Sequence, residues 1–281
     1  MRLTSRFGPA AALAFLCGAG AALAQEGLEI IGRPTPGGTG FQPAATGVAQ
    51  GIRDLDHMLL VIITAIVIFV TALLVLVALR YNGKVNPKPA KFTHNSPLEI
   101  TWTVVPILIL VFIGAFSLPV LFHQMELPKA DVNVKITGNQ WYWNYEYPDE
   151  GVAFDSFLIG DGKVLTPEVE AQLVEAGYSR EDFLLATDTA LVVPVNKNVV
   201  VTTTGSDVIH AWMVPSLGVQ LSAVPGRLSQ LWFKADKEGI YFGQCSTLCG
   251  KDHAYMPITV KVVSEAAYAD WLAKAKVDTP S

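Results

Sequence analysis

Two long apolar stretches stand out in the first half of the chain. Residues 58–79 carry no charged side chain and are rich in Val, Ile, Leu and Phe, and a second apolar stretch runs from about residue 100 to 122. A helix rises about 1.5 Å per residue, so each stretch is long enough to cross a hydrocarbon core of roughly 30 Å. The first stretch also lacks the polar stripe of a helix packed in a globular core. We therefore predict a transmembrane hairpin over residues 57–123, with spans at about 58–79 and 100–122.

Beyond this hairpin the pattern changes to short segments in which apolar and polar residues alternate. Such segments, separated by turn residues, predict strands at 131–137, 140–147, 191–195, 199–204, 228–234, 239–244 and 258–263. Their number and spacing favour a Greek-key sandwich or barrel. A short helix is expected inside an insertion at 160–182, between Thr166 and Gly177, and Ser264 is expected to cap a final helix. Residues 124–281 are thus predicted to form one mostly β domain.

The N-terminus has the pattern of a cleaved secretory signal over residues 1–24. Arg2 and Arg6 precede an apolar stretch at 10–22, and Ala22-Leu23-Ala24 matches a small-residue cleavage site. Cleavage would remove Cys17 and leave Cys245 and Cys249 as the two cysteines of the mature chain. Residues 25–56 would then form an extracytoplasmic arm, whose Gly- and Pro-rich part at 32–47 we expect to be mobile.

The charges predict the orientation of the hairpin in the membrane. The connection at 80–97 has no acidic residue and carries four basic ones: Arg80, Lys84, Lys88 and Lys91. Basic connections stay in the cytoplasm, so both termini are expected outside. Residues 123–281 hold 12 basic and 20 acidic side chains, a formal charge of −8. An acidic surface repels nucleic acid and attracts a basic partner, although ordinary solubility charge explains it equally well.

Two features near the spans and strands have both a structural and a functional interpretation. Glu99 lies at the start of the second span. It is either a hydrated carboxylate that favours the helix dipole or an entry point for protons. The run at 141–147 has five aromatic residues, and alternation puts Trp141, Trp143, Tyr145 and Tyr147 on one face of a strand. That face is either a core face or an aromatic platform exposed to a redox partner.

The residues with the clearest chemistry lie near the C-terminus. Cys245, Cys249, His253 and Met256 fall within twelve residues, and His210 lies on a separate β segment. Two thiolates, two imidazoles and a thioether form a soft ligand set that suits copper. Two sulfurs can bridge two copper ions, and such a pair reorganises little on electron transfer. The alternatives are a disulfide between the cysteines and a four-ligand zinc site without Met256.

Several motifs together resemble the cytochrome c oxidase subunit II family of the bacterial haem–copper type, over nearly the whole mature chain. They are F-T-H-N-S-P-L-E-I-T-W-T-V-V-P, Q-W-Y-W-N-Y-E-Y, D-V-I-H-A-W, V-P-G-R and C-S-T-L-C-G-K-D-H-A-Y-M-P. The resemblance implies a cupredoxin-like Greek-key β-barrel domain that holds a binuclear copper A centre. It also implies a two-helix transmembrane hairpin packed against oxidase subunit I and the other oxidase subunits.

The resemblance also implies roles for individual residues. His210 and His253 would each bind one copper, Cys245 and Cys249 would bridge both, and Met256 would be a weak axial ligand. The backbone carbonyl of Thr247 would complete the second copper. Outside the ligand set, Trp141 matches the electron entry residue. Glu146 and Asp207 match acidic positions that face cytochrome c, and Glu99 matches a carboxylate at the mouth of a proton channel.

Two positions depart from the family pattern. Family members usually carry a glutamate where this chain has Thr247, and that carboxylate binds a magnesium ion between subunits II and I. A neutral hydroxyl is a poor substitute as a hard-cation ligand. We therefore expect weakened or absent magnesium binding. Asn139 stands where the family often has a histidine, and we have no physical account of its effect.

The predicted role is electron transfer from cytochrome c, through copper, to haem in subunit I. Oxygen would be reduced to water there, coupled to proton pumping, in the inner membrane of a bacterium with the copper domain in the periplasm. Quinol oxidase subunits keep the fold but lack the copper ligands, which are all present here. A membrane-tethered copper carrier has no use for the aromatic and acidic positions. The chain is too short for the additional catalytic domain of nitrous-oxide-reducing enzymes.

Overall fold

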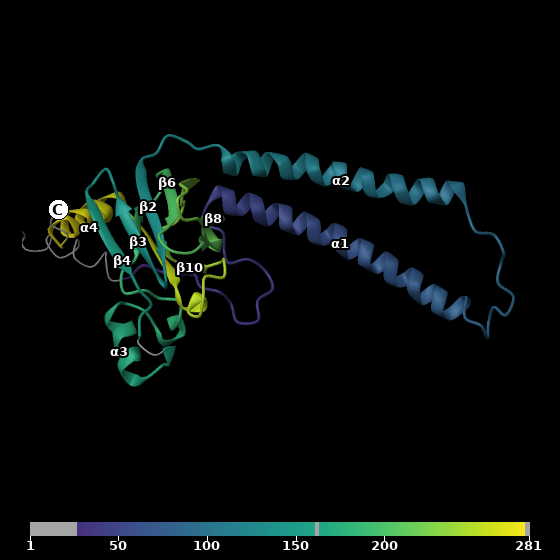
Figure 1. Cartoon of the computed structure of the whole chain (residues 1–281), viewed down its shortest axis with the longest axis horizontal. Helices are drawn as coiled ribbons and strands as arrows, with labels where there is room; N and C mark the ends of the chain where they lie inside the picture. Colours follow the sequence, from purple (N-terminus) through teal and green to yellow (C-terminus); the bar gives the residue numbers. More distant parts are fainter. Residues whose placement is uncertain (1–26, 161–162, 279–281) are drawn as a thin grey trace, which may run out of the picture.

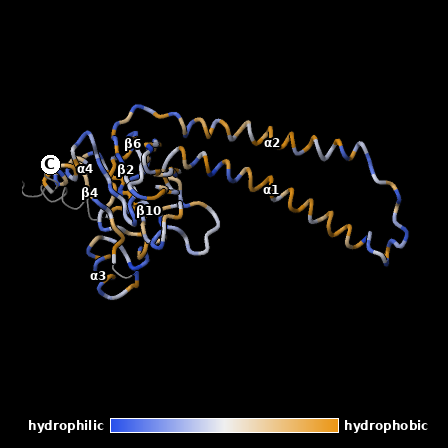
Figure 2. Tube along the Cα trace, viewed as in Figure 1, coloured by the Kyte–Doolittle hydropathy of each residue, from blue (hydrophilic) through white to orange (hydrophobic). Residues whose placement is uncertain are grey.

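The chain forms a helical hairpin that extends from a β domain. The computed structural model describes residues 27–160 and 163–278, so the predicted signal at 1–24 lies outside the described residues. Helices α1 (Gly47–Arg80) and α2 (Ser96–Met125) run side by side away from the domain (Figure 1). Both are long and apolar enough to cross a membrane, and Figure 2 shows their largely apolar course. Each helix extends beyond the predicted span, and α1 begins eleven residues before it.

The β domain is a sandwich of two sheets. One has the order β5-β11-β10-β7-β8, with β1 added beside β10, and the other has the order β4-β3-β2-β6-β9. The strands of the first sheet are β1 (Ile30–Gly32), β5 (Leu191–Pro194), β7 (His210–Val214), β8 (Val219–Ala223), β10 (Gly239–Cys245) and β11 (Pro257–Val263). Those of the second are β2 (Val132–Asn139), β3 (Tyr142–Tyr147), β4 (Val152–Ser156), β6 (Val199–Gly205) and β9 (Ser229–Phe233). The predicted mostly β fold is confirmed. Strands β4 and β8, five residues each, were not predicted.

Large side chains from both sheets fill the space between them. Trp143, Tyr145, Trp212, Phe233 and Tyr241 are all fully buried. Burying an apolar side chain of this size contributes about 2 kcal/mol or more, so this layer dominates the stability of the domain. Helix α4 (Glu265–Asp278) closes one end of the core and begins at the predicted cap, where Ser264 Oγ accepts a hydrogen bond from the amide of Ala267 at 3.2 Å.

The insertion forms a small lobe against the outer face of β10. It contains helix α3 (Pro167–Glu175), which starts and ends as predicted, and the 3-10 turn η2 (Arg180–Asp182). A second apolar cluster joins the lobe to the strand, and its buried members are Ile159, Val169, Leu173, Tyr178, Ala186, Ile240 and Phe242. The lobe is therefore packed onto the strand that ends in Cys245.

The N-terminal arm, whose part at 32–47 was predicted to be mobile, contacts the β domain near both ends of that part. Strand β1 pairs in parallel with β10, and a Cβ on Gly32 would lie 2.7 Å from the Cα of Tyr241. Farther along, the amide of Ala45 donates to the carbonyl of Ser216 at 2.8 Å, and the hydroxyl of Thr46 donates to the carbonyl of Leu217 at 2.9 Å. At Gly32, therefore, glycine permits a close backbone approach, and composition alone suggested flexibility instead.

Candidate metal centre

One end of the first sheet, where β10 finishes and β7 begins, gathers the predicted metal ligands. Strands β7 and β10 are antiparallel neighbours, with Cys245 opposite Trp212, so β7 starts where β10 ends. His210 is the first residue of β7 and Cys245 the last of β10. The loop that follows β10 contains Cys249 and the one-turn 3-10 helix η4 (His253–Tyr255), and ends at Met256.

The donor atoms of these residues lie within a few ångströms of one another. The two cysteine sulfurs are 3.8 Å apart. Around Cys245 Sγ lie His210 Nδ1 at 4.0 Å and the carbonyl oxygen of Thr247 at 3.3 Å. Around Cys249 Sγ lie His253 Nδ1 at 3.5 Å and Met256 Sδ at 3.6 Å. Strand β7 and the loop together thus place one nitrogen and one further donor beside each sulfur.

The two thiols are free, and they differ in acidity. Burial opposes the ionisation of both. At Cys245, contacts with His210 and with the amide of Ala211 outweigh burial and lower the pKa of the thiol to about 6. At Cys249, burial and the negative charge on Cys245 together raise the pKa of the thiol. Without metal, one thiolate is therefore favoured and the second is opposed, and a cation between the sulfurs would relieve that repulsion.

A carboxylate contacts the ring nitrogen of His210 that faces away from the sulfurs. Asp207 Oδ1 lies 2.9 Å from His210 Nε2, and Asp207 Oδ2 accepts a hydrogen bond from the amide of Gln140 at 2.8 Å. A carboxylate beside Nε2 makes that nitrogen the protonated one, which leaves the lone pair of Nδ1 directed at the sulfurs. Asp207, predicted to face cytochrome c, therefore also orients a ligand.

The ring of His210 lies flat against the backbone of β2. A Cβ on Gly138 would lie 2.8 Å from His210 Cγ, closer than atoms pack. Glycine at this position gives the imidazole its space. Sequence analysis assigned no role to Gly138, although it lies just before the aromatic motif that was singled out.

Trp141 touches the ligand loop from the turn between β2 and β3. Its Nε1 donates to the carbonyl of Cys249 at 3.3 Å, and Gln140 Nε2 donates to the same carbonyl at 2.8 Å. Lys251 lies over the indole, 5.5 Å from the ring centroid. One hydrogen bond thus joins the half-buried indole to the backbone of a predicted ligand. The role of Gln140 was missed because the sequence motif does not show that its side chain contacts the distant Cys249.

The predicted aromatic face divides at Trp141. Strand β3 begins only at Tyr142, and Trp143, Tyr145 and Tyr147 are buried in the core. The prediction that Trp141 belongs to the strand was wrong, because Trp141 lies in the turn before β3, although it packs against the same core. The core interpretation holds for the other three, and Trp143 also reaches the ligand loop from inside the core, where its Nε1 donates to the carbonyl of Met256 at 3.4 Å.

The two remaining predicted site residues lie away from this centre. Glu146 is on β3 and forms an ion pair with Lys135 on β2 at 2.7 Å, at a partly exposed position. Glu99 is in the first turn of α2, where its Oε1 accepts a hydrogen bond from the amide of Asn95 at 2.9 Å. This contact satisfies the backbone amide of the N-cap residue and so stabilises the start of the helix.

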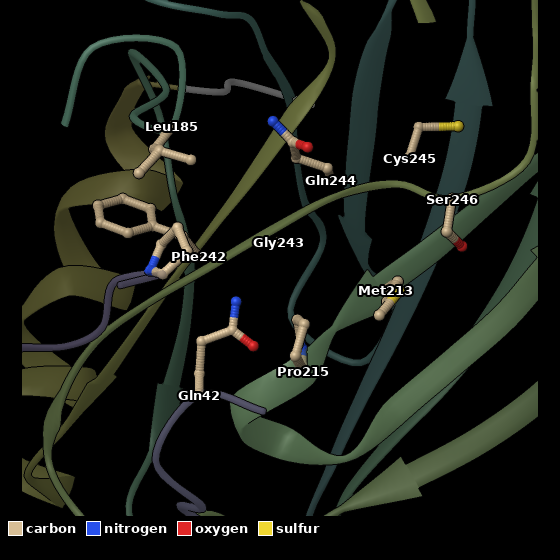
Figure 3. Close-up of a pocket in the computed structure, with 10 residues that line it drawn as sticks. Gln42, Leu185, Met213, Pro215, Phe242, Gly243, Gln244, Cys245 and Ser246 are labelled. Carbon is tan, nitrogen blue, oxygen red and sulfur yellow. The ribbon is translucent and has the colours of Figure 1, made fainter. Parts of the chain in front are cut away.

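A cavity of about 240 Å³ lies next to the centre but does not open onto the sulfur. Gln42, Met213, Pro215, Phe242 and Gln244 are among its lining residues. Figure 3 shows the sulfur of Cys245 pointing away from these side chains. Four of the five ligand side chains are enclosed: His210, Met256, Cys249 and Cys245 are 0%, 1%, 4% and 5% exposed, whereas His253 is partly exposed.

The donor set fits copper better than zinc. A structural zinc site is complete with four nitrogen or sulfur ligands. Here a buried thioether and a backbone carbonyl lie beside the two sulfurs in addition to the two imidazoles. Soft thioether and thiolate ligands select copper, and two sulfurs with four further donors around them are enough for a pair of ions. The protein therefore has the residues for a binuclear copper centre.

Comparisons with known proteins identify a family with this two-part architecture. Residues 132–263 match the family model "Cytochrome C oxidase subunit II, periplasmic domain", and residues 34–120 match the model of its transmembrane domain. The chain is 64% identical over 273 residues to cytochrome c oxidase subunit 2 of Cereibacter sphaeroides, covering 95% of this chain and 90% of that protein. It is 44% identical to the probable cytochrome c oxidase subunit 2 of Rickettsia bellii, covering 85% of each.

A solved structure also matches the β domain. It is the periplasmic domain of cytochrome oxidase subunit II from Bradyrhizobium japonicum, 46% identical, covering 54% of this chain and 99% of that one with a TM-score of 0.46. Both parts of the chain, the helical hairpin and the β domain, are thus matched by models of one family, and a bacterial relative matches nearly their whole length. The chain belongs to the cytochrome c oxidase subunit II family, whose members are part of a haem–copper oxidase complex.

Proposed function

We propose that this chain is the electron-accepting subunit of its oxidase. It would hold a binuclear copper A centre that takes electrons from cytochrome c and passes them to haem in subunit I. There oxygen would be reduced to water, coupled to proton pumping. The observation that carries the proposal is the pair of free thiols 3.8 Å apart, surrounded by two imidazoles, a thioether and a carbonyl.

The ligands of the proposed centre come from three places in the fold. Cys245, Cys249, His210 and His253 would hold the copper ions, and Met256 and the carbonyl of Thr247 would complete the set. When bound, the copper pair supplies a one-electron acceptor whose charge is shared over two ions. The protein's own contribution is rigidity, since buried ligands restrained by neighbours move little when the charge changes.

Electron entry is proposed at Trp141. The indole is half-buried at the surface and its Nε1 reaches the carbonyl of Cys249, which gives a short connection from the surface to a bridging sulfur. The formal charge of −8 on residues 123–281 would attract a basic cytochrome c, with Asp207 and Glu146 among the contributing carboxylates. Asp207 is one-third exposed, so it can orient His210 and still face a partner.

The membrane part supports a location in the inner membrane of a bacterium, with the copper domain in the periplasm. The basic connection between α1 and α2 would lie in the cytoplasm. Glu99 at the start of α2 would then be at the cytoplasmic boundary, at the mouth of a proton channel into subunit I. Magnesium between subunits II and I would be weakly held or absent, because Thr247 offers no carboxylate.

The burial of the ligands opposes the alternative of a copper carrier. A carrier exchanges its ion with a partner and needs ligands that the partner can reach. Here four of the ligand side chains are at most 5% exposed. An enclosed site suits an ion that stays in place while electrons pass.

Copper analysis and spectroscopy of the purified oxidase test the proposal. We expect two copper ions per chain at this site, and an electron paramagnetic resonance signal in which one unpaired electron is shared equally by both. The Cys249→Ser variant should lose that signal. A single exchangeable Cu(I) would refute the electron-transfer role, and so would a Cys245–Cys249 disulfide without copper in the assembled oxidase.

A further inference from the structure

The insertion lobe reaches the metal centre through one side chain, Lys163. Its ammonium forms an ion pair with the carboxylate of Asp252 and lies 4.3 Å from the centroid of the Tyr255 ring. Asp252 and Tyr255 are the residues immediately before and at the end of η4, the one-turn helix that begins with His253. A single cation therefore contacts both ends of the turn that carries a predicted ligand.

The backbone of η4 gives the turn little support of its own. Its short hydrogen bonds are from the amide of Tyr255 to the carbonyl of Asp252 at 2.9 Å and from the amide of His253 to the carbonyl of Gly250 at 3.3 Å. An aspartate before a helix usually caps it through the side chain. The carboxylate of Asp252 makes no such cap and instead binds Lys163. The restraint on this turn thus comes from outside the loop.

The lobe that supplies Lys163 is itself firmly held. Its apolar cluster packs on β10, and a Cβ on Gly160 would lie 2.6 Å from a methyl group of Val169, which shows how tightly the lobe is packed. At its other end, the fully buried carboxylate of Asp182 accepts hydrogen bonds from Arg33 at 3.0 and 3.1 Å. Lys163 therefore connects the packed lobe to a ligand turn with few backbone hydrogen bonds of its own.

We propose that Lys163 is a positioning residue for the metal centre, which fixes η4 and so holds His253 in place against Cys249. This inference rests on the proposed copper function and extends it to the lobe, to which that function assigns no part. Lys163 itself touches no ligand donor. Its effect passes through Asp252 and Tyr255, so its loss should loosen the centre without removing a ligand.

The test compares variants of the full-length chain, purified in detergent and loaded with copper. Lys163→Met removes the charge and keeps most of the length of the side chain, and Lys163→Arg keeps the charge. Arg180→Gln is the matched control, because Arg180 pairs with Glu170 within the same lobe and does not touch the ligand loop. A copper(I)-selective chelator then measures how fast copper leaves, and paramagnetic resonance measures how the unpaired electron is distributed.

We expect Lys163→Met to release copper about tenfold faster and to alter the copper hyperfine pattern, since both an ion pair and a cation–π contact are lost. Lys163→Arg should release copper within about twofold of the rate of the unchanged chain. Arg180→Gln should release copper at the same rate as the unchanged chain. If Lys163→Met equals the unchanged chain in both measurements, the inference is overturned. It is also overturned if Arg180→Gln has the same effect, because general loosening of the lobe then explains the result.

A measurement without metal separates this inference from the copper proposal. Hydrogen exchange at the amide of Tyr255 in the metal-free chain should be faster in Lys163→Met and unchanged in Arg180→Gln. If the unchanged chain binds no copper pair, the proposed function fails, and this exchange still reports whether Lys163 holds the turn. Equal exchange in all variants would refute the restraint itself.

Discussion

Replacing Gly138 by alanine should shift the predicted copper ligand His210, although no ligand residue is itself substituted. The added Cβ would meet three atoms of His210, Cγ at 2.8 Å and Cβ and Cδ2 at 2.9 Å. An ordinary contact needs at least about 3.4 Å, so the backbone and the ring must separate by about 0.6 Å. The backbone cannot supply this shift easily, because Gly138 is paired with Trp143 on one side and Gly205 on the other.

The ring of His210 must therefore move, and it is restrained as well. Its Nε2 is 2.9 Å from Asp207, so a shift of this size strains that contact and turns Nδ1 away from Cys245. Overpacking of this kind costs about 1–3 kcal/mol. For a domain of this size, the thermal midpoint should fall by roughly 2–10 °C. Copper retention should weaken by about tenfold, within the range for changes to groups that orient a ligand.

Two glycine variants control the experiment. Gly40→Ala places a Cβ in open space and should behave like the unchanged chain. Gly32→Ala would crowd the Cα of Tyr241 at 2.7 Å, at the end of β10 away from Cys245, so it should lower stability without a specific change in the copper spectrum. Thermal unfolding, copper per chain and the paramagnetic signal are measured for each. A Gly138→Ala chain with an unaltered midpoint, copper content and spectrum would refute this reasoning.

Four further substitutions test other residues around the site. Trp141→Phe removes the Nε1 donor and should slow oxidation of cytochrome c at least tenfold with an unchanged copper spectrum; an altered spectrum would instead indicate a structural role. Asp207→Asn should weaken copper binding about 10- to 100-fold, because His210 loses the carboxylate that orients it, and a titration showing full affinity would contradict that role. Glu146→Gln breaks a partly exposed ion pair, so the free energy of unfolding should change by less than about 1 kcal/mol while the salt dependence of cytochrome c oxidation becomes shallower; an unchanged slope would remove Glu146 from the docking surface. Thr247→Glu should keep the copper spectrum, because the contact to Cys245 uses the main chain, and should increase magnesium in the purified oxidase; full magnesium before the change would show that no carboxylate is needed.

The site residues that could be grouped from the sequence are those that lie close together along the chain. Cys245, Cys249, His253 and Met256 lie in one loop, so their proximity follows from chain connectivity. His210, by contrast, was added through the D-V-I-H-A-W motif, and the pairing of β7 with β10 brings it to the loop. Local sequence was therefore sufficient for the loop donors, and the family resemblance supplied His210.

The supporting residues were not predictable in the same way. Gln140 and Cys249 are 109 positions apart, and Gln140 and Asp207 are 67 apart, so no local period connects them. Their contacts exist only because the turn after β2, the loop before β7 and the ligand loop meet at one end of the sandwich. The contact of the arm with β10 was missed for a related reason, since Gly32 gives no local sign of the distant strand that it approaches.

The pairing of β1 with β10 has a consequence for the order in which the protein matures. Ile30 is opposite Ile240, so β1, near the start of the described chain, can pair only after β10, near its end, has been synthesised. The two apolar helices α1 and α2 lie between these strands in the chain. Closing a loop of that length carries an entropic cost that is recovered only once the later strand has formed. We therefore expect the sheet that carries Cys245 to gain β1 only after both apolar helices and β10 have been synthesised.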